Sequence, residues 1–161
     1  FTMRPPGGAP EFLGGLIGLP LKDMVANNFI PEYAVIGAPI DERTGRLGPA
    51  YRKKLDEVMD PIDVHPTSGV RIKGFRLPHW TDTKQLALRA HRTLSNIARI
   101  GWDIALTANG PVIIEGNKTP GGDSFQVAHK TPWGATPFPE LYIENLNEAV
   151  QGNSRQSSVA A

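Results

Sequence analysis

The segment from Ile100 to Asn117 constrains the fold most strongly, because its pattern is that of two strands joined by a tight turn. Its sequence is IGWDIALTANGPVIIEGN, in which apolar residues dominate both halves. An Asn-Gly dipeptide lies between the halves, and this pair is a strong short-range indication of a hairpin. The sequence therefore predicts a β-hairpin over residues 100–117.

The register of this hairpin decides which side chains share a face. A two-residue loop at the Asn-Gly dipeptide would put Asp103 and Glu115 on opposite faces, because side chains alternate along each strand. A three-residue loop that ends in a left-handed Gly110 makes Thr107 face Pro111 and Asp103 face Glu115. We expect the second register, because it gathers a wholly apolar face. That face consists of Ile100, Trp102, Ile104, Leu106, Val112 and Ile114.

In the second register Asp103, Glu115 and Asn117 lie together on the other face. Opposed β-carbons are about 5 Å apart, and two carboxylates so held repel by roughly 3 kcal/mol at an effective dielectric constant near 20. A divalent cation offsets this repulsion, and two carboxylates with an amide oxygen are ligands that Mg²⁺ accepts. Zinc is not expected, because the chain has no cysteine and no histidine lies near the hairpin. The alternative is a solvated face on which the carboxylates pair with Arg99 or Lys118.

The clearest helix is expected over residues 82–98. Its start at Asp82, with Gln85 three residues later, resembles a capping box. Apolar residues at helical spacing form one stripe, which should pack on a sheet. The stripe consists of Leu86, Ala90, Leu94 and Ile97.

Glycine (17 residues) and proline (15 residues) are spread along the chain without a period, which indicates many turns rather than disorder. Shorter elements are predicted between these turns. They are a helical turn over 12–17, a strand over 33–40 with a turn over 41–45, a short helix or lid over 52–59, a strand over 70–75, and a closing helix over 139–150 followed by a disordered tail over 151–161.

Length and charge limit the functional classes. A chain of 161 residues is long enough for one compact domain. Lysine plus arginine (17) nearly balance aspartate plus glutamate (16), so we expect no nucleic-acid or anionic-membrane partner. No apolar run approaches the roughly 20 residues that span a bilayer. The absence of cysteine fits a cytoplasmic protein, and a start at Phe1 leads us to expect a fragment of a longer protein.

The hairpin and the residues after it resemble a known enzyme family. The run Gly101-Trp102-Asp103, the segment 110–117 (GPVIIEGN) and the triplet 120–122 (PGG) are similar to the C-terminal motif of ATP-grasp enzymes, in particular the sugar-transfer associated ATP-grasp family. Other matching pieces follow in the family's order over roughly residues 1–130. They are Asn28-Phe29, residues 38–41 (APID), residues 44–47 (TGRL), His65-Pro66 and Pro78-His79-Trp80.

The resemblance implies an α+β fold, the C-terminal lobe of an ATP-grasp domain over residues 1–150, with a mostly antiparallel sheet and flanking helices. ATP would be clasped between two lobes, with Mg²⁺ bridging its phosphates. Asp103, Glu115 and Asn117 match the motif positions that hold this metal and nucleotide. The N-terminal lobe that completes such a site is missing from these residues, so an upstream lobe is the expected partner.

The implied reaction activates a small-molecule carboxylate as an acyl phosphate and joins it to an amine, and the family suggests a link to polysaccharide biosynthesis. Arg4 would lie near the phosphate or acyl phosphate, where a guanidinium fork suits oxygen anions. Asn28 would line the site, and Lys118 would meet the substrate carboxylate. Each of the three also has a structural alternative, namely a surface arginine, a loop-capping asparagine and a solvated lysine.

Two other functions are consistent with the same residues. One is a non-catalytic ATP-grasp-like remnant that acts as a binding module, with the acidic face kept as surface. The other is a metal-assisted phosphohydrolase, for which the sequence shows no further ligand cluster. His65, His79 and Trp80 could each contact a substrate or form structural hydrogen bonds.

Overall fold

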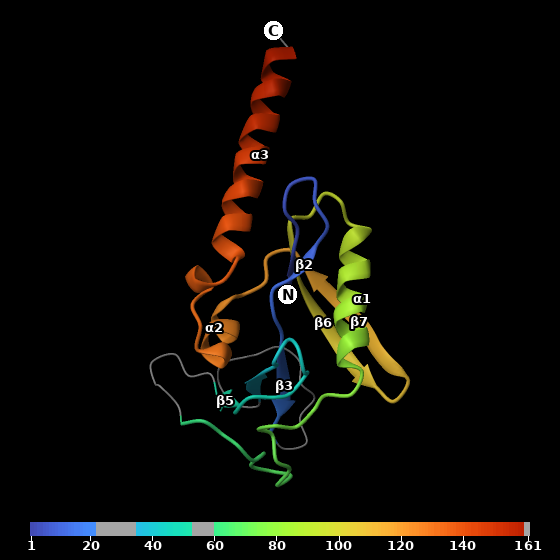
Figure 1. The fold of residues 1–161 in the computed structure, drawn as a ribbon, viewed down its shortest axis with the longest axis vertical. Helices are drawn as coiled ribbons and strands as arrows, with labels where there is room; N and C mark the ends of the chain where they lie inside the picture. Colours follow the sequence, from blue (N-terminus) through green and yellow to red (C-terminus); the bar gives the residue numbers. More distant parts are fainter. Residues whose placement is uncertain (22–34, 53–59, 160–161) are drawn as a thin grey trace.

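The computed structural model describes residues 1–21, 35–52 and 60–159, and for residues 152–159 it describes the backbone alone. Within these ranges the strands form two antiparallel sheets (Figure 1). The first sheet has the order β2-β1-β6-β7. Its strands are β1 (Thr2–Met3), β2 (Glu11–Phe12), β6 (Arg99–Thr107) and β7 (Gly110–Asn117).

The second sheet has the order β3-β4-β5. Its strands are β3 (Leu16–Pro20), β4 (Val35–Pro39) and β5 (Tyr51–Arg52). The predicted strand over 33–40 is confirmed by β4, and the turn after it closes through a bridge between Ile40 and Leu47.

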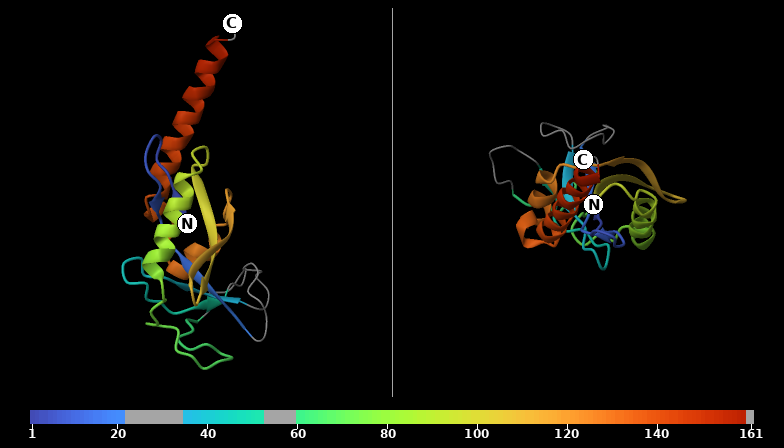
Figure 2. Two further views of the ribbon diagram at one scale, coloured as in Figure 1. Left: turned by 90° about the vertical axis from the view of Figure 1, so that its right-hand side faces the viewer. Right: turned by 90° about the horizontal axis from the view of Figure 1, so that it is seen from above.

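Three α-helices and one short 3₁₀ turn accompany the sheets in the described ranges. Helix α1 lies along the β6–β7 hairpin, whereas α3 projects away from the body of the molecule (Figures 1 and 2). The α+β class with antiparallel sheets and flanking helices is as predicted. None of these helices combines the length and the apolar composition that a bilayer crossing requires. The bounds are α1 (Trp80–Arg92), α2 (Asp123–His129), the 3₁₀ turn (Trp133–Ala135) and α3 (Phe138–Val159).

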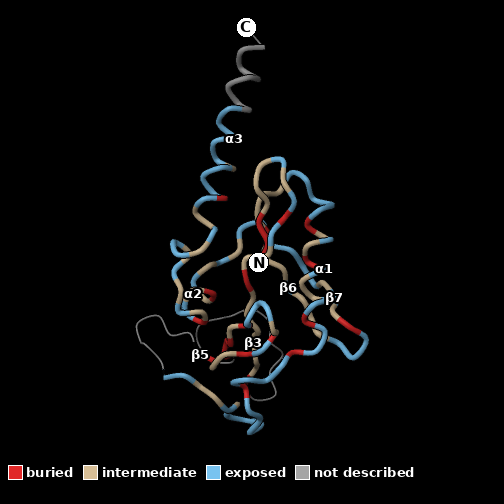
Figure 3. Tube along the Cα trace, viewed as in Figure 1, coloured by how far each residue is buried: buried red, intermediate tan, exposed pale blue. Residues whose placement is uncertain are grey.

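The largest cluster of buried side chains lies at the second sheet (Figure 3). Ile36, Ala38 and Ala50 are fully buried there. Trp80, the first residue of α1, packs into the same cluster and donates a hydrogen bond from Nε1 to the Glu42 carbonyl at 2.9 Å. The start of α1 is thereby anchored to the second sheet.

A buried hydrogen-bond chain fixes the other end of α1 to the first sheet. Trp102 Nε1 donates to Thr2 Oγ1 at 2.8 Å, and the Thr2 hydroxyl lies 2.8 Å from His91 Nδ1. His91 Nε2 donates to the Ile97 carbonyl at 2.8 Å. Burial lowers the pKa of His91, so the ring stays neutral, accepting at Nδ1 and donating at Nε2. Strands β1 and β6 and helix α1 are joined by this chain.

The predicted helix over 82–98 is wrong at both ends. Helix α1 begins at Trp80 after His79, whose φ of 53° is left-handed, and Asp82 lies in the first turn rather than at the cap. It ends at Arg92, because the Ile97 carbonyl accepts from the His91 ring and the chain has turned toward β6 by then. Of the predicted stripe, Leu94 lies outside the helix and is 40% exposed.

An aromatic cluster packs against the opposite face of the first sheet. Phe1 adjoins Thr2 and therefore points to the face away from α1. Its ring centroid is 4.9 Å from that of Trp133, and Trp133 stacks on Phe125 of α2 at 4.4 Å and packs on Phe138 of α3 at 5.0 Å. The sheet thus lies between α1 and the α2–α3 segment.

Three further predictions of local structure are wrong. Residues 12–17 do not form a helical turn, because Leu16 onward pairs with β4 over five positions. Residues 70–75 do not form a strand, because left-handed Gly69 and Gly74 bend the chain on either side and only Arg71 forms a bridge, to Val64. Helix α3 does not end at Val150 but continues through Val159. Residues 53–59, most of the predicted helix or lid over 52–59, lie outside the described residues.

We predict that Gly45→Ala destabilises the protein more than Gly69→Ala. Both glycines have a φ of +69°, so both substitutions carry the same left-handed strain of about 1–2 kcal/mol. A β-carbon at Gly45 would lie 2.7 Å from Trp80 Cβ, whereas nothing lies within 4 Å at Gly69. The crowded site should cost about 1–3 kcal/mol more in the free energy of unfolding, measured by urea denaturation. Equal losses for the two variants would contradict the packing of Trp80 against this turn.

Candidate functional site

The turn of the β6–β7 hairpin is tighter than the sequence predicts. Thr107 pairs with Gly110, which leaves a two-residue loop of Ala108 and Asn109. Thr107 Oγ1 donates to the Gly110 carbonyl at 2.7 Å and accepts from the Asn109 N–H at 3.1 Å. Gly110 has the expected positive φ, 112°. The predicted three-residue loop, with Thr107 opposite Pro111, is therefore wrong.

A β-bulge in β7 nevertheless brings the two carboxylates into register. Ile104 pairs with Ile113, but the next pair is Asp103 with Glu115, so Ile114 is an extra residue on the β7 side. One added residue reverses the alternation of side chains along the rest of β7. The prediction that Asp103 faces Glu115 is therefore correct, although its cause is the bulge and not the loop.

Asn117 completes a cluster on this face. Its Nδ2 donates to Glu115 Oε1 at 3.2 Å, and its backbone pairs with Gly101, two residues before Asp103. Partial burial, followed by hydrogen bonding to Glu115 and the charge of Glu115, raises the pKa of the Asp103 carboxyl above its ordinary value of 3.8. We call Asp103, Glu115 and Asn117 the acidic cluster.

The acidic cluster has no basic side chain to neutralise it among the described residues. The ion pairs recorded there join Lys73 to Asp63 and His79 to Asp82, and neither carboxylate of the cluster takes part in one. The alternative of surface pairs with Arg99 or Lys118 is therefore not what the hairpin forms. The Phe1 ammonium attracts Asp103, but burial lowers the pKa of this ammonium to about 5, so it is mostly uncharged at pH 7. Two acidic groups held face to face with so little compensation are suited to a cation.

Two exposed apolar residues flank the acidic cluster, and sequence reasoning misplaced both. Val112 and Ile114, expected in the core, are 49% and 67% exposed. The two-residue loop pairs Val112 with Ala105 and so turns it away from the α1 side, while Ile114 is the bulge residue. Choosing the shorter loop from the Asn-Gly dipeptide would have predicted the exposure of Val112.

Arg4 lies away from the acidic cluster. Its backbone N–H donates to the Ala98 carbonyl, five residues before Asp103 and hence about 16 Å along the strand. Its Nη2 donates to the His91 carbonyl at 2.9 Å, at the end of α1. Arg4 and Asp103 thus face opposite sides of the sheet, and a role of Arg4 at a phosphate stays a prediction.

Of the other two predicted site residues, Lys118 is among the described residues and Asn28 is not. Lys118 follows Asn117 directly and is exposed at the end of β7. Asn28 lies within 22–34, outside the described residues.

His65 and Trp80 have structural contacts. His65 accepts at Nδ1 from the Ser68 N–H at 3.1 Å and bonds through Nε2 to the Pro20 carbonyl at 2.9 Å, which closes a turn. Trp80 is a core residue. The His79 carbonyl accepts from the N–H and the hydroxyl of Thr83, so this residue caps α1 through its backbone.

We predict that Asp103→Asn stabilises the metal-free protein at pH 7, by about 0.2–1 kcal/mol, the range of directly opposed charged pairs on a sheet. The raised pKa of Asp103 determines the sign of this change in the free energy of unfolding. A carboxyl group that binds its proton more tightly when folded destabilises the folded state at pH values above that folded pKa. The gain should therefore shrink as the pH falls through the folded pKa and vanish below 3.8. Urea unfolding across this pH range measures it.

Glu148→Gln is the matched control, because Glu148 is an exposed carboxylate on α3. Its effect should stay within about 0.5 kcal/mol at any of these pH values. A loss of stability in Asp103→Asn at pH 7 would show that the Asp103 charge is favourably paired in the folded protein.

Comparison with known proteins places these residues in a family. The family model described as sugar-transfer associated ATP-grasp matches residues 24–134, more than half of the 161 residues. The match includes the acidic cluster, Asn28 and Lys118, but not Arg4. No curated protein and no solved structure matches the chain. With its antiparallel α+β fold and its Asp, Glu and Asn on one face of a hairpin, the chain belongs to the sugar-transfer associated ATP-grasp family.

Proposed function

We propose that the chain supplies the metal-binding side of the ATP site in an ATP- and Mg²⁺-dependent ligase that joins a carboxylate to an amine. The observation that carries this proposal is the direct opposition of Asp103 and Glu115 across β6 and β7, with Asn117 in contact with Glu115. An upstream N-terminal lobe is proposed to hold the adenine and the other phosphates.

The donor set of the acidic cluster fits Mg²⁺. This ion is commonly held by one or two carboxylates together with substrate phosphates and waters, rather than by an all-protein cage. In the described part of the chain no group of three or more histidine, aspartate or glutamate side chains gathers, so the site offers only these two carboxylates and an amide. Such a set leaves coordination positions for phosphate oxygens. Bound there, Mg²⁺ would neutralise charge on the transferred phosphoryl group.

The residues of this chain would act by positioning. The opposed carboxylates of Asp103 and Glu115 fix two ligand positions across the hairpin, and the hydrogen bond to Asn117 orients Glu115. Val112 and Ile114 expose apolar surface beside the carboxylates. Lys118, which follows Asn117 directly, is proposed to contact an anionic group of the substrate.

In the proposed reaction a substrate carboxylate oxygen attacks the γ-phosphorus of ATP and ADP leaves. The amine nitrogen then attacks the acyl carbon, phosphate leaves with the bonding electrons, and the nitrogen loses a proton. The family's association with sugar transfer favours, by analogy, a carboxylate or amine that belongs to polysaccharide assembly.

We predict that Asp103→Asn and Glu115→Gln each weaken Mg²⁺-dependent ATP binding at least ten-fold in the full-length protein, because each removes one of two anionic ligands. Isothermal titration with ATP, with and without Mg²⁺, measures the effect. Glu148→Gln should bind as wild type does. Equal Mg²⁺ dependence in wild type and both cluster variants would remove the ligase proposal and favour the non-catalytic binding module.

The acyl phosphate has its own test. Hydroxylamine can replace the amine and convert an acyl phosphate into a stable hydroxamate. Full-length protein incubated with ATP, Mg²⁺, hydroxylamine and a panel of small carboxylic acids should form a hydroxamate with at least one of them, and the Asp103→Asn variant should not. Phosphate release from ATP that is unaffected by any acid and yields no hydroxamate would instead favour phosphohydrolysis.

A further inference from the structure

A hollow lies under the first part of α3, on the same face of the first sheet as the acidic cluster. It has a volume of about 290 Å³. Met3, Ile97 and Leu146 give it apolar walls, and Asn145 contributes an amide whose Nδ2 is fixed by bonds to the Arg4 and Leu141 carbonyls. This size is just below the usual range for ligand pockets, so it suits only a small molecule.

Two cationic residues line this hollow, and its lining residues include no carboxylate. Arg99 and Lys118 are the charged residues of the lining. The Arg99 guanidinium carbon lies 5.2 Å from the centre of the Tyr142 ring, a stacking that holds the guanidinium in place on α3. Within the described ranges neither cation takes part in an ion pair. An anion bound in the hollow would be attracted by both charges.

The hollow is separate from the acidic cluster. Arg99 and Asp103 share a face but lie four residues apart on β6, which is about 13 Å. Gly101 lies between them, and Pro120 covers it so closely that a β-carbon on Gly101 would be 2.5 Å from Pro120 Cβ. A ligand in the hollow is therefore held beyond Pro120 from the carboxylates.

We propose that this hollow binds a small organic anion, a carboxylate carried on an apolar or aromatic body. The guanidinium of Arg99 and the ammonium of Lys118 bind the carboxylate, and Met3, Ile97 and Leu146 contact the apolar body. This inference shares Lys118 with the proposed ligase site, but binding in the hollow needs neither ATP nor Mg²⁺.

Benzoate is the probe, and benzamide is its neutral counterpart of nearly the same shape. In a titration of the full-length, metal-free protein followed by ¹H–¹⁵N NMR, benzoate should give saturable shifts for residues 96–99, 118 and 142–146. Benzamide should bind at least ten-fold more weakly, because it cannot form the charge-assisted hydrogen bonds. Added chloride should weaken benzoate binding but not benzamide binding.

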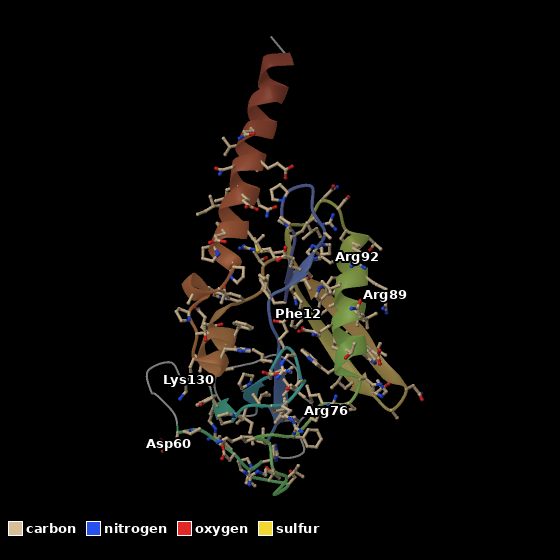
Figure 4. All side chains as sticks on the ribbon, viewed as in Figure 1. Phe12, Asp60, Arg76, Arg89, Arg92 and Lys130 are labelled. Atoms are coloured by element: carbon tan, nitrogen blue, oxygen red, sulfur yellow. The ribbon has the colours of Figure 1, made fainter. Side chains whose placement is uncertain are left out.

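Arg99→Gln and Lys118→Gln should each weaken benzoate binding about ten-fold. Arg92→Gln is the matched control, because Arg92 is an exposed arginine at the end of α1 (Figure 4) and does not line the hollow. Tyr142→Leu keeps an apolar wall but removes the stacking, and should weaken binding less than Arg99→Gln does. The urea midpoint of each variant shows whether it is folded.

The proposal is overturned if benzoate and benzamide bind alike, or if Arg99→Gln binds benzoate as tightly as Arg92→Gln does. It is also overturned if no saturable shift appears at about 10 mM benzoate, ten times a weak dissociation constant of about 1 mM. Failure of this experiment leaves Mg²⁺ binding at the acidic cluster unaffected, so the two proposals are tested separately.

Discussion

A single extra residue in β7 decides the chemistry of the hairpin face. Side chains in paired strands alternate with a period of two, so one inserted residue moves every later side chain to the other face. Between the turn and Ile113 the strands pair in a register that would carry Glu115 to the α1 side. The bulge at Ile114 reverses this and sets Glu115 opposite Asp103, with Asn117 following on the same face. Removing the bulge would leave the strands paired but would separate the carboxylates.

The rest of the fold holds this hairpin in place from both sides. On one side, the buried chain from Trp102 through Thr2 to His91 joins the sheet to α1 with every polar atom of the chain paired. On the other side, Phe1 and the aromatic residues of α2 and α3 pack together. The carboxylates lie in the middle of the hairpin on the face away from α1, where they and the apolar residues beside them are exposed.

The exposed face therefore carries two regions of opposite charge on one strand. Asp103 lies toward the hairpin tip and Arg99 lies at the beginning of β6, with Gly101 and its covering residue Pro120 between them. Glycine at 101 is required by this close approach rather than by backbone flexibility. The proposed cation site and the proposed anion site are thus separated along the strand, with Pro120 packed against Gly101 between them.

The sequence by itself predicted the hairpin, a strand over 33–40, the antiparallel α+β class and, through an incorrect loop length, the grouping of Asp103, Glu115 and Asn117. These follow from local patterns, namely apolar periodicity, an Asn-Gly turn and a family motif. Only the tertiary structure decided the loop length, the bulge, the exposure of Val112 and Ile114, and the end of α1 at Arg92. It also brought Arg99, Lys118 and Tyr142 together from β6, the end of β7 and α3. The reason is physical. A bulge costs little in local energy, and contacts between distant segments leave no periodic pattern in the sequence. Several strand registers are therefore compatible with the sequence, and tertiary packing selects one of them.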